Sequence, residues 1–216
     1  QRQRGKVMEL ALGFLGGAGA LQSMGRGYGL ILGDDEAERL RDVWRSLNPW
    51  AMAYGKELER AAMSAVLHPG GWFEAGRVAY GCNGDWLWCR LPSTRLIAYY
   101  QPKLEGKMTP WGDEVTTITA SAGGRVKTKV GTWRRLALWP GMLLENITQA
   151  TAADLLRESL LACEDDGVPV VLHVHDEIVS LGDCRDQLHA IMTEQRPWAG
   201  GLPLAAEAGG GMRYGK

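Results

Sequence analysis

Two adjacent carboxylates interrupt a strand-like run in the last quarter of the sequence. In VVLHVHDEIVSL (170–181), Asp176 and Glu177 follow His173 and His175. Neighbouring carboxylates repel each other, and a divalent cation is the usual means of keeping both ionised. Because Mg²⁺ binds one or two carboxylates together with substrate phosphate oxygens, the triplet His-Asp-Glu could form half of a phosphoryl-transfer site. In isolation, the same triplet more often marks a solvated turn whose histidines bond to their neighbours.

The strand that precedes the triplet decides how its side chains are presented. Alternation along this strand predicts that His173 and His175 share one face, whereas Leu172 and Val174 point into the core. A tight turn between this strand and the next, IVSL, would then present both carboxylates together at the rim of a sheet.

A basic and apolar stripe lies at the start of the chain, in RQRGKVMELALGF. Arg2, Lys6, Leu10 and Phe14 recur at every fourth residue and would share one face of a helix that is predicted to run to about Phe14. At 1.5 Å per residue the stripe would span roughly 18 Å, enough to reach from a triphosphate to a stacked base. The basic end of an ordinary amphipathic surface helix would give the same pattern, and is the more common case.

Basic residues are concentrated locally, although the formal net charge of −1 gives no global sign of nucleic-acid binding. Segment 90–135 holds nine basic against three acidic residues, whereas acid gathers at 34–38 and 164–166. Such segregation suits a surface that faces phosphates, but a plain solvated face gives similar asymmetry. The nine basic residues are Arg90, Arg95, Lys103, Lys107, Arg125, Lys127, Lys129, Arg134 and Arg135.

The composition is that of an ordinary globular protein, with 216 residues, 45% hydrophobic and 23% charged. This length suits one sizeable domain or two small ones. The four cysteines include no CxxC pair, and the sequence has neither a signal peptide nor an apolar run long enough to span a bilayer. We therefore expect reduced thiols in the cytoplasm, no structural zinc and no membrane association.

The elements that must position these residues change character near residue 70. The first seventy residues read as helices, two of them over 34–48 and 49–68. Strands follow at 77–81, 85–92 and 94–100, and a hairpin insertion is predicted near 112–139, turned at Gly123-Gly124. A helix from about Thr148 to Glu164, the strands around the triplet and a helix over 185–194 complete the pattern. The predicted fold is α+β, a helical region over 1–70 followed by an antiparallel sheet backed by helices over 71–216.

Taken together in this order, the two stretches resemble the C-terminal part of the family A DNA polymerases, most closely those of bacteriophages. RQRGKVMELALGFLGG is similar to the second motif of the family, on the fingers helix, and LHVHDEIV to its third motif, the His-Asp-Glu of the palm. Three further stretches also resemble the family: CRLPSTRLIAYYQPKL, WPGMLLENITQATAADLL and the C-terminal GLPLAAEAGGGMRYGK. The resemblance implies that 1–70 are fingers and 71–216 the C-terminal palm, in the cytoplasm of a phage-infected or lysogenic bacterium.

The resemblance implies template-dependent nucleotidyl transfer from a dNTP to a primer 3′-OH by two-metal catalysis. Asp176 would bind both Mg²⁺ ions, with Glu177 beside it near the primer end, and His175 would hold the primer terminus. Lys6 and Arg2 would hold the phosphates of the nucleotide, and Lys6 would donate a proton to the pyrophosphate leaving group.

The remaining positions concern the base pair and the DNA. Phe14 stands at the aromatic position that stacks at the template base, where many members carry Tyr. Gln149 matches a glutamine that contacts the minor groove of the new pair. Asn146 is a looser match, and Arg95 belongs to the basic segment expected to contact DNA. Leu10 stands where many members carry Phe or Tyr against the nucleotide sugar, which puts sugar selection in doubt.

The first motif of the family, a strand that ends in a catalytic aspartate, should precede the fingers helix and is not found in this sequence. The sequence begins with QRQRGK, without methionine, and looks like the continuation of a longer protein. Since two-metal catalysis needs both aspartates, we expect these 216 residues alone to be inactive. The expected partners are primer-template DNA, a dNTP and an N-terminal remainder that carries the aspartate, in the same chain or as a separate subunit.

Two other functions fit parts of the pattern. A metal-dependent hydrolase could use His173, His175 and Asp176 as ligands, but only His68 and His189 remain as further histidines, neither of them in a motif. A non-catalytic nucleic-acid-binding subunit could use the basic segment 90–135 and would bind DNA with a steep dependence on salt.

Overall fold

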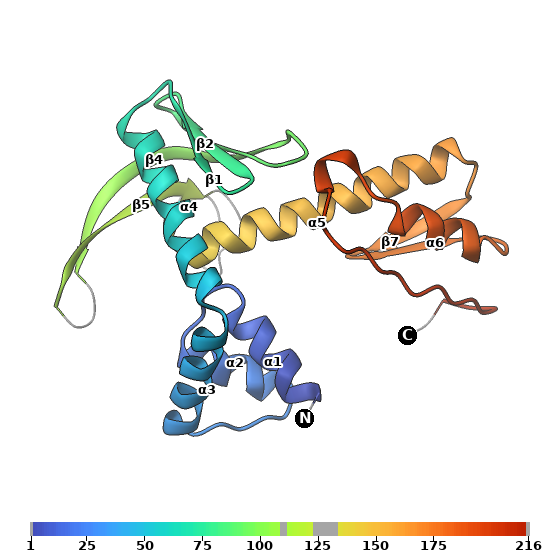
Figure 1. Cartoon of the computed structure of the whole chain (residues 1–216), viewed down its shortest axis with the longest axis horizontal. Helices are drawn as coiled ribbons and strands as arrows, with labels where there is room; N and C mark the ends of the chain where they lie inside the picture. The colour runs from blue at the N-terminus through green and yellow to red at the C-terminus, as the bar shows by residue number, and fades with distance from the viewer. Residues whose placement is uncertain (1, 109–111, 123–133, 215–216) are drawn as a thin grey trace. The chain divides into compact units, whose positions relative to one another are not determined.

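The computed structural model describes residues 2–108, 112–122 and 134–214 (Figure 1). The chain divides into two compact units, Gln1–Leu91 with Leu96–Ile147, and Pro92–Arg95 with Thr148–Lys216. The change from helices to strands occurs near residue 70, as expected. The division between the two compact units does not fall there but between Ile147 and Thr148, with Pro92–Arg95 also in the second unit. The assignment of 1–70 and 71–216 to fingers and palm stays a prediction. Among the described residues, no helix combines the length and apolar character needed to cross a bilayer.

Four helices open the first unit. They are α1 (Arg2–Leu12), α2 (Ala18–Gly27), α3 (Asp34–Leu47) and α4 (Pro49–Leu67). Val7, Leu12, Leu21 and Trp44 are buried between α1, α2 and α3, and the Trp44 Nε1 donates a hydrogen bond of 3.0 Å to Glu9. The predicted helices over 34–48 and 49–68 are confirmed. Three acidic residues in the first turn of α3 complement the helix dipole, and Pro49 occupies the first turn of α4.

The first helix ends earlier than the stripe pattern predicts. The amide of Leu15 bonds to the carbonyl of Leu12 at 2.8 Å, and Leu15 has a φ of +62°. At Gly16 a Cβ would lie 2.1 Å from the carbonyl oxygen of Ala11, so only glycine fits this close return of the backbone. Phe14 therefore lies in the turn after α1 and not on the helix face that carries the other stripe residues.

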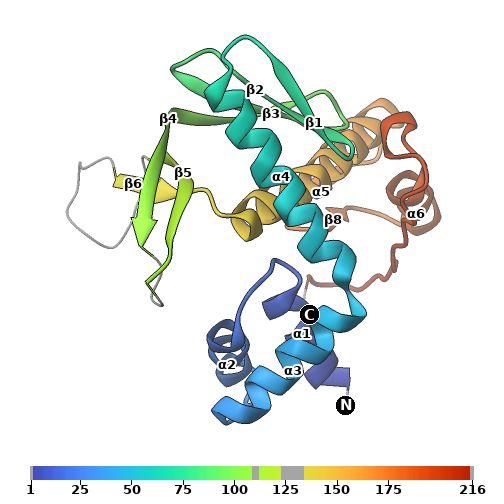
Figure 2. The ribbon, with the colours of Figure 1, turned by 60° about the vertical axis from the view of Figure 1, so that its left-hand side comes forward.

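A six-stranded antiparallel sheet completes the first unit. Its strands are neighbours in chain order: β1 (Trp72–Ala75), β2 (Val78–Cys82), β3 (Trp86–Arg90), β4 (Leu96–Met108), β5 (Glu114–Ala122) and β6 (Arg134–Ala137). Figure 2 shows α4 lying against the strands, and α4 contacts β1 to β4. One face of the sheet is buried there, including Tyr80, Leu87 and Cys89.

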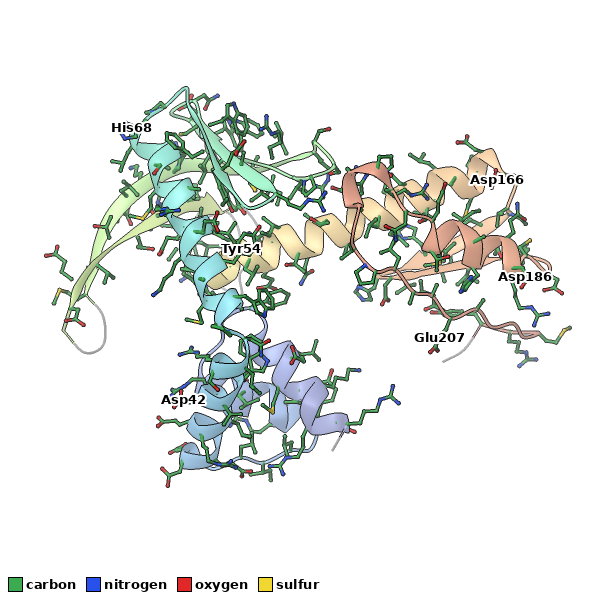
Figure 3. All side chains as sticks on the ribbon, viewed as in Figure 1. Asp42, Tyr54, His68, Asp166, Asp186 and Glu207 are labelled. Carbon is green, nitrogen blue, oxygen red and sulfur yellow. The ribbon has the colours of Figure 1, made fainter. Side chains whose placement is uncertain are left out.

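Tyr54 lies on α4 in this contact (Figure 3), where burial raises its pKa to about 12. Within the segment 112–139, predicted as a hairpin insertion, β5 and β6 pair from Thr119↔Ala137 to Ala122↔Arg134. The predicted turn at Gly123-Gly124 lies outside the described residues. Since β5 also pairs with β4, the hairpin continues the sheet and is not a separate protrusion.

The second unit is built around the helix α5 (Pro140–Asp165). The first residues of α5, up to Ile147, belong to the first unit, and the rest of the helix, from Thr148, belongs to the second. The second unit also contains β7 (Val170–Val174), β8 (Glu177–Ser180), α6 (Arg185–Thr193) and a short 3₁₀ helix, η1 (Pro197–Ala199). Cys163, Val168, Ile178 and Ile191 form its core. The helix predicted from Thr148 begins earlier, at Pro140, because proline is well suited to a first helical turn.

The mixed class with antiparallel strands is confirmed, but the strands in the described part of the chain form two sheets and not one. The pair β7–β8 is a separate two-stranded sheet. Which strands share a sheet is decided by pairing between distant segments, and the local alternation that identifies each strand carries no information on it.

Candidate active site

The triplet His-Asp-Glu occupies the tip of the β7–β8 hairpin. Val174 pairs with Glu177, so that His175 and Asp176 form a two-residue turn. His175 has a φ of +54°, in the left-handed region that a tight hairpin turn requires. The predicted tight turn is thus confirmed, and the carboxylates stand at the rim of the sheet.

The faces of the strand differ from the expectation. His173 pairs with the buried Ile178, and Leu172 pairs with Val179. His173 therefore lies on the same face as the core residue Ile178, although its own side chain is exposed. Leu172 and Val174 face the other way, and Leu172 is 42% exposed. The register shifts between Val170 and Leu172, and this one extra residue reverses the alternation along the rest of the strand. The prediction that Leu172 and Val174 point into the core was therefore wrong.

The two carboxylates differ in their surroundings. Asp176 is exposed at the turn, whereas Glu177 is half-buried and its Oε2 accepts a hydrogen bond of 3.2 Å from the hydroxyl of Tyr214. Tyr214 lies 37 residues further along the chain, in the C-terminal segment GGGMRYGK, and sequence reasoning missed it. Its position in a stretch that resembles the phage enzymes was the available signal, but nothing there indicates its partner.

A cavity of about 850 Å³ opens beside this pair of carboxylates. Its walls are the tip of the hairpin, the loop and helix that follow β8, and the C-terminal segment on which Figure 3 labels Glu207. Arg185, His189 and Arg213 bring basic groups to the lining. Arg185 bonds to Asp183 at 2.8 Å, which lowers the pKa of that carboxyl below its usual value. The candidate site therefore has both acidic and basic walls.

The candidate site offers Asp176 and Glu177 as possible metal ligands. Among the residues that the structure describes, no three His, Cys, Asp or Glu side chains are grouped closely enough to hold a metal ion. Two hard carboxylates match Mg²⁺, which completes its coordination with water and substrate oxygens.

The basic stripe lies on α1 in the first unit. Arg2 and Lys6 are exposed and Leu10 is 41% exposed. Within the described part of the chain neither basic side chain forms an ion pair, and the Lys6 Nζ stands 5.8 Å from the ring centroid of Tyr28. Two uncompensated cations one helical turn apart are suited to bind an anion with more than one phosphate.

The turn that carries Phe14 is fixed by two glycines within the first unit. A Cβ on Gly141, in the first turn of α5, would lie 2.2 Å from the carbonyl oxygen of Phe14. A Cβ on Gly55, in α4, would lie 2.4 Å from a methyl group of Leu15. The backbone of the half-buried Phe14 thus lies close to α5 at Gly141, and the neighbouring Leu15 side chain packs on α4 at Gly55.

The three predicted DNA-binding residues lie at or near α5. Gln149 is exposed on α5, in the second unit. Asn146 belongs to the first unit, where its Nδ2 donates a hydrogen bond of 3.0 Å to the hydroxyl of Tyr99. Arg95 donates from Nε to the Asp154 Oδ1 at 2.5 Å and from its terminal nitrogen to the Ala150 carbonyl at 2.9 Å. Its side chain is therefore occupied in holding residues 92–95 to α5.

Asp154 is a buried carboxylate that sequence reasoning missed. Its side chain is 1% exposed and accepts hydrogen bonds from Ser93 and Arg95, each 2.5 Å long, with Arg157 at 3.1 Å. A single acid in the otherwise small and apolar run ATAADLL (150–156) was the signal for it.

The chain is similar to a bacteriophage protein along almost its whole length. Over 211 residues it is 38% identical to a protein named DNA polymerase from Bacillus phage SP02, an alignment that covers 95% of this chain. The chain spans 31% of the length of that relative. No family model matches the chain. No solved structure matches it either.

Proposed function

We propose that the chain is the fingers and C-terminal palm of a bacteriophage-type family A DNA polymerase, which extends a primer by nucleotidyl transfer from a dNTP. The observation that carries the proposal is the pair Asp176–Glu177 at the tip of a tight hairpin, beside a large cavity. The similarity to a phage protein named DNA polymerase supports it along 95% of the chain.

In this proposal the hairpin tip holds the reacting end of the primer. Bound at Asp176 and Glu177, Mg²⁺ would activate the primer 3′-OH and neutralise charge on the transferred phosphate. Asp176 would bind the ions through its exposed carboxylate, and the hydrogen bond from Tyr214 would fix the rotamer of Glu177. His175 would contact the primer terminus from the same turn.

The exposed face of α1 would bind the incoming nucleotide. Arg2 and Lys6 carry no ion pair in the described part of the chain and would hold its phosphates, and Lys6 would donate a proton to the pyrophosphate leaving group. Leu10 would contact the sugar and Phe14 the template base. Further DNA contacts, from Gln149, Asn146 and Arg95, complete the proposed set.

A second polypeptide segment is part of the proposal, because two-metal catalysis needs another aspartate. The outer face of the β7–β8 hairpin is a suitable place for it. There Val171 is 56% exposed and Leu172 is 42% exposed. A sheet of two strands is marginal in water and has open edges, so we propose that an upstream segment carrying the aspartate covers this face.

Primer extension tests this function. The chain, joined to or mixed with an upstream segment that carries the proposed aspartate, should extend a primer in the presence of Mg²⁺, and the chain alone should not. Lys6→Ala should raise the KM for dNTP and lower kcat, because the side chain is proposed both to bind and to protonate the phosphates. Salt-sensitive DNA binding without any extension by the joined chain would instead favour a non-catalytic nucleic-acid-binding subunit.

A further inference from the structure

The uncovered face of the first sheet is aromatic. Strand register places Trp72, Gly81, Trp88 and Ala98 in one row across β1 to β4, with side chains on the same side. This is the face opposite to the one that packs on α4. Trp86 and Tyr100 are a direct cross-strand pair two residues along, and therefore lie on it too.

The aromatic rings on this face contact one another. The Trp86 and Trp88 rings are stacked, with centroids 5.6 Å apart and planes at 28°, and Tyr100 stands 4.7 Å from Trp86. Trp72, which is 46% exposed, lies directly on Gly81. A Cβ on Gly81 would come within 2.8 Å of the Trp72 ring. Only glycine lets the indole ring lie this close to the sheet. Trp86, Trp88 and Tyr100 are half-buried, and aromatic side chains gathered on a face that no described helix of the unit covers are typical of a binding surface.

Positive charge accompanies the rings. The guanidinium of Arg90 is 4.9 Å from the centroid of the Trp72 ring, and Lys103 is on the same face because it pairs with Thr119. Both are exposed, and neither forms an ion pair within the described ranges. The face also carries Glu74 and Glu105, but the latter lies 3.9 Å from Arg135 and is thereby compensated.

We propose that this face, formed by Trp72, Trp86, Trp88, Arg90 and Tyr100, binds single-stranded DNA. Unpaired bases stack on aromatic rings and on guanidinium planes, and uncompensated cations attract the phosphates between them. Duplex DNA would hide its bases from the rings. With neighbouring strands about 4.8 Å apart, the face is roughly 14 Å wide, which is room for two or three bases.

The choice of DNA over RNA rests on the proposed function, because a DNA polymerase works on a single-stranded template. The site is otherwise independent of the candidate active site: it lies in the first unit, and Asp176 and Glu177 lie in the second. Loss of one activity can therefore be separated from loss of the other.

Fluorescence titration of the chain with an oligothymidylate of about twelve nucleotides tests the proposal. Trp72→Ala should weaken binding about tenfold or more, and Trp72→Phe, which keeps a ring, should recover most of the affinity. Arg90→Ala should weaken binding and reduce the slope of log K against log salt by about 0.7, the value for one phosphate contact on a single strand.

Trp50→Ala is the matched control. Trp50 is 61% exposed and lies on α4, away from the aromatic face, so its removal should leave the affinity unchanged. Asp176→Asn should also leave single-strand binding unchanged, while abolishing primer extension if the proposed function holds. Retained extension in Asp176→Asn would count against the proposed function and leave the binding site standing.

Three results would overturn the proposal. Equal affinity of Trp72→Ala and the unmodified chain would remove the rings from the site. Equally tight binding of inorganic polyphosphate would mean that only charge is recognised. Loss of self-association, measured by ultracentrifugation, in a Trp72→Ala variant with unchanged DNA affinity would assign the face to protein contact.

Discussion

The buried carboxylate of Asp154 allows a quantitative test of how the second unit is held together. It accepts hydrogen bonds from Ser93 and Arg95, which tie residues 92–95 to α5. Asp154→Ala removes the acceptor and leaves the hydroxyl and guanidinium donors without their partner. Asp154→Asn keeps the shape of the side chain but removes its charge.

The loss of unfolding free energy expected for Asp154→Ala follows from the burial of this carboxylate. Removing one partner of a fully buried ion pair costs about 3–5 kcal/mol. The Asp154 side chain is 1% exposed, but those of Arg95 and Arg157 are 33% and 53% exposed and can turn to water, so the lower end of this range applies. We expect Asp154→Ala to lower the free energy of unfolding by about 3 kcal/mol, a large part of the 5–15 kcal/mol typical of a domain.

Urea unfolding measures the total loss of unfolding free energy in Asp154→Ala. Hydrogen exchange read by mass spectrometry should show the loss of protection in α5 and residues 92–95. Asp165→Ala is the control, since Asp165 is exposed on the same helix and should change stability by no more than about 0.5 kcal/mol. In a double-mutant cycle, Arg95→Ala and Asp154→Ala should be coupled by about 1 kcal/mol or more. A loss below about 1 kcal/mol, or no coupling, would refute the reasoning.

Three further perturbations follow from single contacts. If the proposed function holds, Tyr214→Phe should lower the kcat of primer extension by about 2- to 10-fold, because Glu177 loses a hydrogen bond. Met212→Ala, at a fully exposed position of the same segment, should leave kcat unchanged. Burial raises the pKa of Cys89 to about 12, so the stability that this buried thiol contributes below pH 9 should be lost as the pH rises from 9 to 12, by roughly 1.4 kcal/mol per pH unit. Alkaline titration of the free energy of unfolding should show a smaller slope in Cys89→Ala than in the unmodified chain, and an equal slope would contradict this cause. Thr94 has a φ of +69°, in the left-handed region that is unfavourable for residues other than glycine. Thr94→Gly should therefore raise the free energy of unfolding by about 1 kcal/mol and increase the urea midpoint. An unchanged or lower midpoint would show that the turn carries no strain.

Features of the fold with local signals were predictable from the sequence. The start of α4 at Pro49 and the acidic first turn of α3 are set by residues within one turn, and both were predicted correctly. The end of α1 was not, because it depends on the close return of the chain at Gly16. The division of the strands into two sheets depends on pairing across long stretches of chain, which local patterns do not encode.

The candidate site also has features that local sequence predicts and features that depend on distant contacts. Asp176 and Glu177 are adjacent in sequence, so their presentation at a turn could be predicted. The side of the sheet on which His173 lies could not, because a single extra residue in β7 reverses it. The contact of Glu177 with Tyr214 joins positions 37 residues apart and has no local signature.

The rate of a single nucleotide addition tests the central claim most directly. Rapid-quench measurement on the chain joined to the proposed upstream segment should compare Asp176→Asn with Asp183→Asn, since both aspartates line the same cavity. If Asp176 binds the catalytic ions, its variant should lose about a thousandfold or more in rate, on the order of 4 kcal/mol of transition-state stabilisation, and the Asp183 variant should stay within about tenfold of the unmodified chain. Equal rates for the two variants would contradict the account.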